Sequence, residues 1–476
     1  LAALAMGNRC VLSFPRGNLG TQRGQFPSRW FLEAASQLYG APVYTSNLGS
    51  LGPVPWLTTI ASIEDGLRTV ATETPADIYD RDVEGLWRWR RAGKRIDQHY
   101  LAASGQLSRA LALEQGREAN QLTCWDGDVS NLKDRTRRLR LMDRPAISPT
   151  SLEVWATCPF RYFLGHVLGL SALEQPEDVA TMSPLEKGSL VHGVLEGFIR
   201  AVQEEGRLPS PGEPWTEEHR DLLYRLANQS FAEAEARGVT GKALLWDLQQ
   251  ETILSDLDAF LSADAELRAR FKVTPHLVEV RFGLSRPSGG DEGLEAAQRE
   301  IPGLGTLRFR GVVDRVDLHP SGKLALVLDY KTGSARSYQA LKDDPVDGGK
   351  RLQLPIYTLA LQKSLGEEVT VRAAYWFISA RGRFAIFPPE PVEIAQVADR
   401  FDSVVGTIAQ GIAEGLFPAN PGPEVQRGFA NCTWCDFNTL CPSRRDIHWE
   451  SKQADPRLQA YLQLQSGEAA QEDGEE

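Results

Sequence analysis

Two neighbouring stretches carry most of the information in this sequence: Gly311-Val312-Val313-Asp314-Arg315-Val316-Asp317 and, soon after it, Leu324-Ala325-Leu326-Val327-Leu328-Asp329-Tyr330-Lys331-Thr332-Gly333. The second is apolar until Asp329, which is typical of a buried β-strand. Side chains alternate between the two faces of a strand, so Asp329 and Lys331 are predicted to share one face. A carboxylate and an ammonium group at the end of a buried strand are costly unless they pair or bind a metal ion.

An isolated Asp-x-Lys is more often a surface ion pair where a strand emerges, so the functional interpretation depends on Asp314. The first stretch is expected to be the preceding strand of a hairpin, which would bring Asp314 close to Asp329. Two close carboxylates repel each other unless a cation neutralises them. Mg²⁺ prefers oxygen ligands and keeps water that can attack a phosphodiester, while a nearby lysine can stabilise developing charge.

The residues around these stretches predict an α/β domain, with helices around a mixed sheet. A boundary near Arg144-Pro145 precedes Ser148-Pro149, an N-cap residue followed by proline at the first helical position. The later elements are expected as helices from Pro184 to Glu205, Thr216 to Ala236 and Lys242 to Arg270, strands from Leu277 to Leu284, Leu307 to Leu318 and Leu324 to Lys331, a helix from Gln353 to Leu365, a strand from Val371 to Ser379 and a helix from Val392 to Leu416.

Four motifs in this region resemble, in their order, those of the RecB-like PD-(D/E)XK nucleases. They are Gly188-Ser189-Leu190-Val191-His192, Gly311 to Asp317, Asp329-Tyr330-Lys331-Thr332-Gly333 and Gln353-Leu354-Pro355-Ile356-Tyr357. The resemblance implies a restriction-endonuclease-like core that hydrolyses DNA with Mg²⁺ or Mn²⁺.

The same resemblance implies roles for individual residues. The metal ligands would be His192, Asp314, Asp329 and the backbone carbonyl of Tyr330. Lys331 would assist catalysis, and Gln353 would support the site or contact DNA. Glu279 and Tyr357 are weaker candidates for support, and Asp317 is expected to be a structural partner of Arg315 or Lys331. A lone helical histidine is more often a satisfied core residue, so the assignment of His192 depends on the whole set of motifs.

The cysteines form a second pattern, Cys432-x-x-Cys435 followed by Cys441, with Cys158 far upstream. Four thiolates can hold zinc or a [4Fe–4S] cluster, and spacing alone does not choose between them. One cysteine before the nuclease core and three after it resemble the iron–sulfur staple of AddB-type nucleases, which implies a [4Fe–4S] cluster, with zinc as the alternative. Cys10 and Cys124 are expected to be ordinary buried thiols.

The flanking regions are less specific. Residues 1–60, with an expected strand from Cys10 to Phe14 and a helix from Ser28 to Leu38, resemble the end of a RecA-like helicase domain in AddB- or AdnAB-type proteins. Residues 61–146 are expected to be a helical linker, whose Trp- and Arg-rich segments at 87–95 and 133–140 either contact DNA or form solvated helix faces. The nuclease domain would span 147–450, and 451–476 would be an acidic, disordered tail.

Composition restricts the function classes. The 476 residues carry a net charge of -11, so any binding of phosphate must use a local basic surface. No apolar run reaches the roughly 20 residues of a membrane helix, and six cysteines are too few for a disulfide scaffold, so a soluble cytoplasmic protein without membrane contact is expected. The start at Leu1 suggests a piece of a longer chain. No Gly-x-x-x-x-Gly-Lys-Ser/Thr loop is present, so these residues are not expected to hydrolyse ATP.

Three functions remain open. The first is the exonuclease module of a recombination-repair helicase–nuclease, acting on DNA ends with a helicase partner subunit. The second is a non-catalytic DNA-binding or scaffolding subunit, and the third is a stand-alone exonuclease of the type associated with CRISPR loci. The presence of His192, Asp314, Asp329 and Lys331 favours a catalytic role, and the long N-terminal region argues against the third.

Overall fold

A computed structural model describes residues 10–16, 25–72, 75, 77–131, 139–171, 180–284, 293–426, 428–442 and 444–466. The chain divides into two compact units. One comprises Leu1–Asp126 and Pro421–Lys452, and the other comprises Gly127–Asn420 and Gln453–Glu476. In the part of the chain that is described, no helix is long and apolar enough to cross a membrane.

The larger unit is built on a five-stranded sheet in the order β1-β4-β5-β6-β7. The strands are β1 Thr274–Phe282, β4 Gly311–Leu318, β5 Leu324–Lys331, β6 Thr370–Phe377 and β7 Ile386–Val392. β4 runs antiparallel to both β1 and β5, whereas β5 and β6 are parallel. The sheet is therefore mixed, as the sequence predicts.

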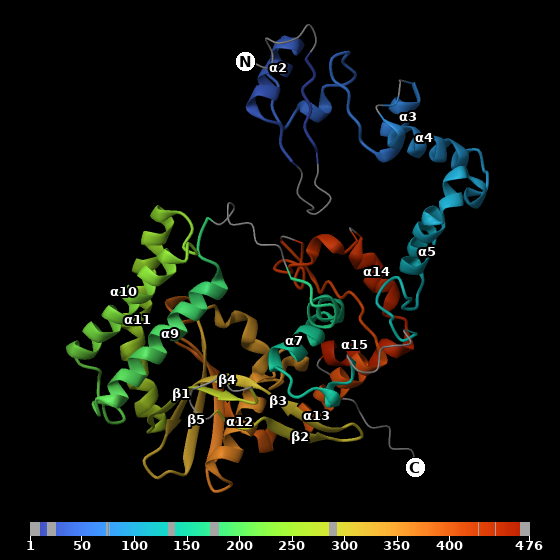
Figure 1. Ribbon diagram of the computed structural model, residues 1–476. Helices are drawn as coiled ribbons and strands as arrows, with labels where there is room; N and C mark the ends of the chain where they lie inside the picture. The colour runs from blue at the N-terminus through green and yellow to red at the C-terminus, as the bar shows by residue number, and fades with distance from the viewer. Residues whose placement is uncertain are drawn as a thin grey trace. The chain divides into compact units, whose positions relative to one another are not determined.

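Helices cover both faces of this sheet (Figure 1). Helices α9 Pro184–Glu204, α10 Glu217–Ala236 and α11 Ala243–Phe271 share a buried cluster with Leu326, Leu328 and Tyr330 of β5. On the other face α12 Gln353–Leu365 packs against β5 and β6, and α7 Pro149–Thr157 and α13 Ile394–Glu414 pack against α12. Because alternate residues of β5 face opposite layers, Asp329 and Lys331 point to the side of α12.

Local sequence signals explain where the helices begin. The Ser183 hydroxyl accepts the Glu186 N–H at 3.1 Å as the N-cap of α9, and Pro184 occupies the first turn. Ser148 and Pro149 open α7 in the same positions, although the Ser148 side chain makes no capping bond to the helix. The observed bounds of α9 to α13 lie within two residues of those predicted.

The predicted single strand from Leu307 to Leu318 was wrong. It is two strands, β3 Gly305–Phe309 and β4, and β3 pairs with β2 Ala297–Ile301 in a separate two-stranded sheet. Between them the Arg310 N–H donates to the Ile147 carbonyl, and the Ile147 N–H donates to that of Arg308. The backbone therefore leaves one sheet and enters the other at this point, which apolar periodicity alone does not reveal. Both β2 and β7 were missed.

The smaller unit is largely helical. It contains α2 Arg29–Tyr39, α3 Ile63–Thr72, α4 Ile78–Arg91, α5 Gln106–Glu118, the short strands β8 Glu424–Val425 and β9 Gly428–Phe429, and α14 Arg445–Lys452. Lys452 holds α14 to the end of α5, since its ammonium group donates to the carbonyls of Gly116, Ala119 and Gln121 at 2.6 to 2.8 Å. One ammonium group thus joins α14 to the last turn of α5 and the chain that follows it.

Two further expectations need correction. The stretch from Cys10 to Phe14 is not a strand; Val11 is 75% exposed and no neighbouring strand pairs with it among the described residues. Part of the tail expected to be disordered is folded, because α15 Gln459–Ser466 buries Tyr461 and Leu464 and the Tyr461 ring packs edge-on against Trp155. Residues 467–476 and most of the basic segment 133–140 lie outside the described residues.

The α8 helix, Pro159–Tyr162, follows α7 directly, with Cys158 between the two. Cys158 is buried, which places it in the core of the larger unit.

Candidate active site and metal centre

The site forms where strands β4 and β5 separate. Their antiparallel pairing ends at Arg315 and Leu328, and the next residue on each strand is Asp314 and Asp329. Beyond this point β5 stays paired with β6 on its other side, but the β4–β5 ladder does not continue. The β4–β5 ladder therefore opens at the two carboxylates that the sequence predicts to be neighbours.

Asp314 occupies the centre of this opening. Its Oδ2 accepts the backbone N–H of Tyr330 at 2.6 Å, and its Oδ1 lies 3.2 Å from His192 Nδ1 on α9. The His192 ring also packs edge-on against the Tyr330 ring, with 5.7 Å between centroids. The Asp314 carboxylate thereby holds together His192 and Tyr330, which are far apart in the sequence.

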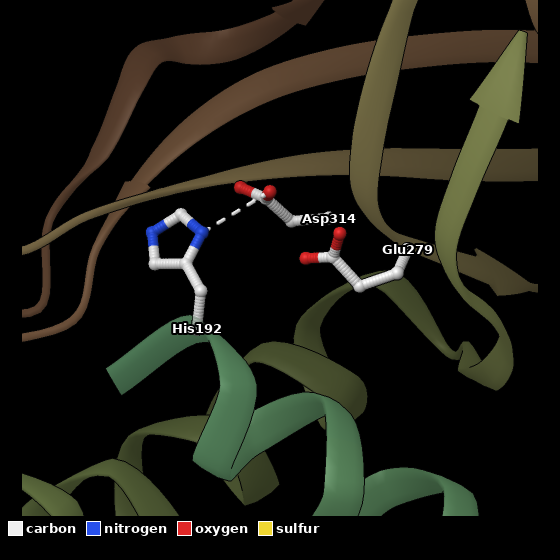
Figure 2. Close-up of side chains that lie close together, drawn as sticks. All are labelled: His192, Glu279 and Asp314. Atoms are coloured by element: carbon white, nitrogen blue, oxygen red, sulfur yellow. Dashed lines mark hydrogen bonds and ion pairs between the residues drawn. The ribbon is translucent and has the colours of Figure 1, made fainter. Parts of the chain in front are cut away.

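Glu279 joins this group from β1, on the other side of β4. One ligand atom from each of His192, Glu279 and Asp314 lies within 4.8 Å of the others, an arrangement that could hold a metal ion. Figure 2 shows the three side chains converging from a helix and two strands. Glu279 has a φ of 51°, and a non-glycine residue in the left-handed region within a strand stores strain that often marks functional sites.

The electrostatics of this group favour a cation. Burial and the nearby Asp314 carboxylate raise the pKa of Glu279 to about 7. Burial also raises the pKa of Asp329 to about 6, although the Lys331 charge opposes this. Burial alone would lower the pKa of His192, but its hydrogen bond to Asp314 and the negative charges of Asp314 and Asp329 together outweigh burial and raise that pKa. A positive ion placed among carboxylates with raised pKa values would stabilise their ionised form.

Lys331 and Asp329 share one face of β5, as predicted, and form an ion pair there. The Lys331 ammonium also donates to Gln353 Oε1 at 3.2 Å, and the Gln353 amide donates to the Tyr357 hydroxyl at 3.3 Å. Burial would lower the pKa of Lys331, but the nearby Asp329, Tyr338 and Asp314 together outweigh burial, with Asp329 contributing most, and raise that pKa. The lysine is therefore a held cation beside the carboxylate group.

Tyr357 also explains the glycine at the start of the first motif. A Cβ at Gly311 would lie 2.9 Å from the Phe282 ring and 3.3 Å from the Tyr357 ring. The two rings pack edge-on with 5.9 Å between centroids. Glycine at this position lets the aromatic pair approach the backbone of β4 close to Asp314.

A buried ionic network lies beneath the site. Arg315 donates to both oxygens of Asp317 at 2.5 and 2.7 Å and to Asp264 on α11 at 2.6 Å, and all three side chains are fully buried. Asp264 also accepts from Arg268 and from the Trp215 indole. The expectation that Asp317 is a structural partner is confirmed for Arg315, which it contacts directly.

The predicted residues thus fall into two adjacent sets. His192, Asp314 and Glu279 form the close group, whereas the Asp329 carboxylate turns toward Lys331 and lies outside it. Tyr330 contacts the site through its N–H, and in a strand the carbonyl of a residue points the same way as its N–H. Glu279 was expected only to support the site, but it belongs to the close group. The strand pattern does not reveal the left-handed backbone at this residue, which redirects its side chain.

The three C-terminal cysteines lie near one another in the smaller unit. The Cys435 N–H donates to the Cys432 carbonyl at 3.2 Å, and all three are partly exposed. Burial, with a smaller contribution from Cys432 and Cys435, raises the pKa of the Cys441 thiol to about 11. Cys10 and Cys124 are exposed, so the expectation that they are buried was wrong.

Comparison with known proteins gives one family match. The sequence profile of the PD-(D/E)XK nuclease superfamily matches residues 146–442, more than half of the chain. The match contains every residue of the two sets described above.

Curated relatives are named as one of the subunits of an ATP-dependent helicase/deoxyribonuclease. The protein of Symbiobacterium thermophilum is 30% identical over 289 residues, which cover 58% of this chain and 23% of the relative. That of Carboxydothermus hydrogenoformans is 29% identical over 240 residues, covering 48% and 20%, and that of Moorella thermoacetica is 29% identical over 334 residues, covering 65% and 27%. The matched part spans about a quarter of the length of these relatives.

Proposed function

The chain belongs to the PD-(D/E)XK nuclease superfamily, and from this we propose that it is a divalent-metal-dependent deoxyribonuclease whose active site lies at the open end of β4 and β5. One observation supports this most: His192, Glu279 and Asp314 form a group that could hold a metal ion directly beside the Asp329–Lys331 pair. Phosphodiester hydrolysis needs a cation near the phosphate and a held positive group for the charge that develops.

The donor set of the close group fits Mg²⁺ or Mn²⁺. Two carboxylates supply the hard oxygen ligands that both ions prefer, and the imidazole nitrogen of His192 makes Mn²⁺ the better match of the two. We propose His192, Asp314 and Asp329 as ligands, with the Tyr330 carbonyl, and add Glu279 to them. A bound ion there would polarise the scissile phosphate and make an attacking water more acidic.

The residues around the ion would orient its ligands and stabilise the charge that develops on the phosphate. Asp314 holds His192 through Oδ1 and the Tyr330 backbone through Oδ2, so the ligands are oriented before any substrate arrives. Lys331 would stabilise the negative charge that develops on the phosphate oxygens. Gln353 accepts from Lys331 and donates to Tyr357, which fixes the direction of the ammonium group. Bound geometry of this kind supplies much of the rate in phosphoryl chemistry.

We further propose that the domain serves as the exonuclease module of a helicase–nuclease that processes DNA ends, with a helicase partner subunit. The support is the name that the relatives carry and their greater length. The alternative of a non-catalytic scaffolding subunit is disfavoured because the ion-pairing and hydrogen-bonding partners of Asp314, Asp329 and Lys331 are all in place. The backbone strain at Glu279, whose side chain lies close to the Asp314 carboxylate, also favours a catalytic role over a scaffolding one.

We also propose that Cys158, Cys432, Cys435 and Cys441 bind one [4Fe–4S] cluster with a structural role. Two observations support this. Four thiols are the donor set of such a cluster, and one of them precedes residues 159–431 while the other three follow. A cluster that joins ligands so far apart in the sequence would restrict the unfolded chain strongly.

The experiment for the nuclease is degradation of linear DNA by the anaerobically purified chain. We expect cleavage with Mg²⁺ or Mn²⁺ and none in EDTA. Metal-independent cleavage would contradict the proposed chemistry, and binding of DNA without cleavage under any metal would support the scaffolding alternative.

A further inference from the structure

We propose that Glu153 is a positioning residue for Lys331, which it serves by holding the first turn of α12. This inference rests on the proposed nuclease function, because it assigns Lys331 a catalytic role. Glu153 lies on α7, outside the four motifs and outside the close metal group, and the proposed chemistry does not use it.

The contact is a hydrogen bond from the Leu352 backbone N–H to Glu153 Oε1 at 2.6 Å, across 199 residues of sequence. Leu352 is the N-cap residue of α12 and its own side chain cannot cap the helix. The first N–H groups of a helix have no partner within it, and a carboxylate near that end is favoured by the helix dipole. Glu153, on the neighbouring helix α7, therefore supplies the hydrogen-bond acceptor that the local sequence lacks.

The held backbone lies next to the site. Gln353 follows Leu352 directly, and its side chain joins Lys331 to Tyr357. A continuous path thus leads from α7 to the catalytic ammonium group: Glu153 to Leu352, through the backbone to Gln353, and from Gln353 to Lys331. A displacement of about 1 Å at a catalytic group can reduce a rate on the order of 100-fold, so a lost anchor at Leu352 has kinetic consequences.

The contact requires an acceptor oxygen rather than a charge. Burial raises the pKa of Glu153 to about 7, with the Leu352 hydrogen bond and the Arg351 charge opposing it. Either protonation state of a carboxyl group keeps an oxygen that accepts a hydrogen bond, and so does the amide of glutamine. Glu153→Gln should therefore preserve the positioning, whereas Glu153→Ala should abolish it.

A purely structural role makes a different prediction. A lost capping interaction would lower the melting temperature and would leave the geometry at Lys331 unchanged in the folded protein. Asp344 offers a matched control, since it accepts the N–H groups of Val346 and Gly348 just before the same helix and pairs with Arg400. Asp344→Ala should lower the melting temperature and leave Lys331 undisturbed.

The test uses the full chain as wild type, Glu153→Gln, Glu153→Ala, Gln353→Ala and the double variant Glu153→Ala/Gln353→Ala, with Asp344→Ala as the control. Glu153→Met, which keeps the length without the acceptor, replaces the alanine variant if that one does not fold. Two readouts are measured. One is the single-turnover rate of DNA cleavage with Mg²⁺, and the other is the rate of acetylation of Lys331 in metal-free protein, relative to exposed Lys363, by mass spectrometry.

For cleavage, we expect Glu153→Ala to lower the maximal rate about 10- to 100-fold, with the DNA concentration at half-maximal rate changed by less than about threefold. Glu153→Gln should stay within about threefold of wild type, and the double variant should be no slower than Gln353→Ala because both act on one path. A double variant whose loss is the product of the two single losses would overturn the proposal.

For labelling, we expect Lys331 to react several-fold faster in Glu153→Ala and Gln353→Ala and at the wild-type rate in Glu153→Gln and Asp344→Ala. A folded Glu153→Ala or Glu153→Met variant with wild-type labelling of Lys331 would refute the positioning role. This readout does not need activity. Wild-type protein that cleaves no DNA but shows the expected labelling would contradict the proposed function and leave the positioning role supported.

Discussion

The backbone N–H of Tyr330 donates to Asp314 Oδ2 at 2.6 Å, across the point where β4 and β5 cease to pair. The Asp314 side chain here takes the place of a ladder hydrogen bond between the two strands. Its other oxygen remains for His192. The direction of the Asp314 carboxylate is therefore set by the fold and does not depend on a bound ion.

The first prediction concerns metal affinity. Because His192 and Glu279 each contribute an atom to the close group, His192→Ala and Glu279→Gln should each weaken Mn²⁺ binding at least about tenfold, which corresponds to about 1.4 kcal/mol. Isothermal titration calorimetry measures this directly. Glu393→Gln is the control, since that carboxylate pairs with Arg372 and lies outside the group. Unchanged affinity in Glu279→Gln would remove Glu279 from the ligand set.

A second prediction concerns pH and stability without metal. The folded-state pKa values of Glu279, about 7, and Asp329, about 6, lie above the usual values for these acids, and that of His192 is also raised. A raised folded pKa contributes stability at low pH that is lost as the pH rises through it. The metal-free domain should therefore become less stable between about pH 5 and pH 8.

Thermal melting in EDTA across this range measures the effect. Glu279→Gln should flatten the decline, because it removes one of the titrating groups. Added Mn²⁺ should raise the melting temperature more at the upper end of the range than at the lower end, since protons compete with the ion. A metal-free stability that rises steadily over this pH range would contradict the carboxylate grouping.

The third prediction concerns the buried network. Arg315→Met should destabilise the domain by about 3 to 5 kcal/mol, because it leaves Asp264 and Asp317 buried without their shared cation. Urea denaturation of the two proteins gives the difference. Arg299→Met removes an ion pair with Asp402 that is partly exposed, and should cost much less. Equal losses would show that burial of the network has no special importance.

Much of this site could be predicted from the sequence. The alternation along β5 placed Asp329 and Lys331 on one face, and the hairpin brought Asp314 beside them. The nearness of His192, which lies 122 residues before Asp314, came from a motif resemblance, because no local pattern encodes a contact over that distance.

The remainder depends on tertiary structure. The importance of Glu279 follows from a left-handed backbone within a strand, which interrupts the alternation on which strand prediction depends. The division between β3 and β4 follows from hydrogen bonds to Ile147, distant in sequence. The carboxylate of Glu153 reaches Leu352 only because α7 packs near α12.

A fourth prediction concerns the cysteines. Anaerobically purified protein should contain iron and sulfide in a ratio expected of one [4Fe–4S] cluster and absorb broadly in the visible range. Cys158→Ala should lose the iron and lower the melting temperature, while Cys10→Ala, an exposed thiol outside the pattern, should change neither. Colourless protein with stoichiometric zinc would overturn the iron assignment, and loss of iron at unchanged stability would contradict the structural role.

The central claim is that DNA is cleaved at the Asp329–Lys331 pair beside the metal group, and the most direct measurement is cleavage of end-labelled linear DNA by Asp329→Ala and Lys331→Ala variants with Mg²⁺ or Mn²⁺. Both side chains sit at the end of β5, and their removal leaves the buried network below intact, so both variants should remain folded by circular dichroism. We expect cleavage to fall by at least about a thousandfold in each, as when groups that act in the transition state are lost. Undiminished cleavage by folded Asp329→Ala protein, freed of contaminating nuclease, would contradict the assignment of the active site.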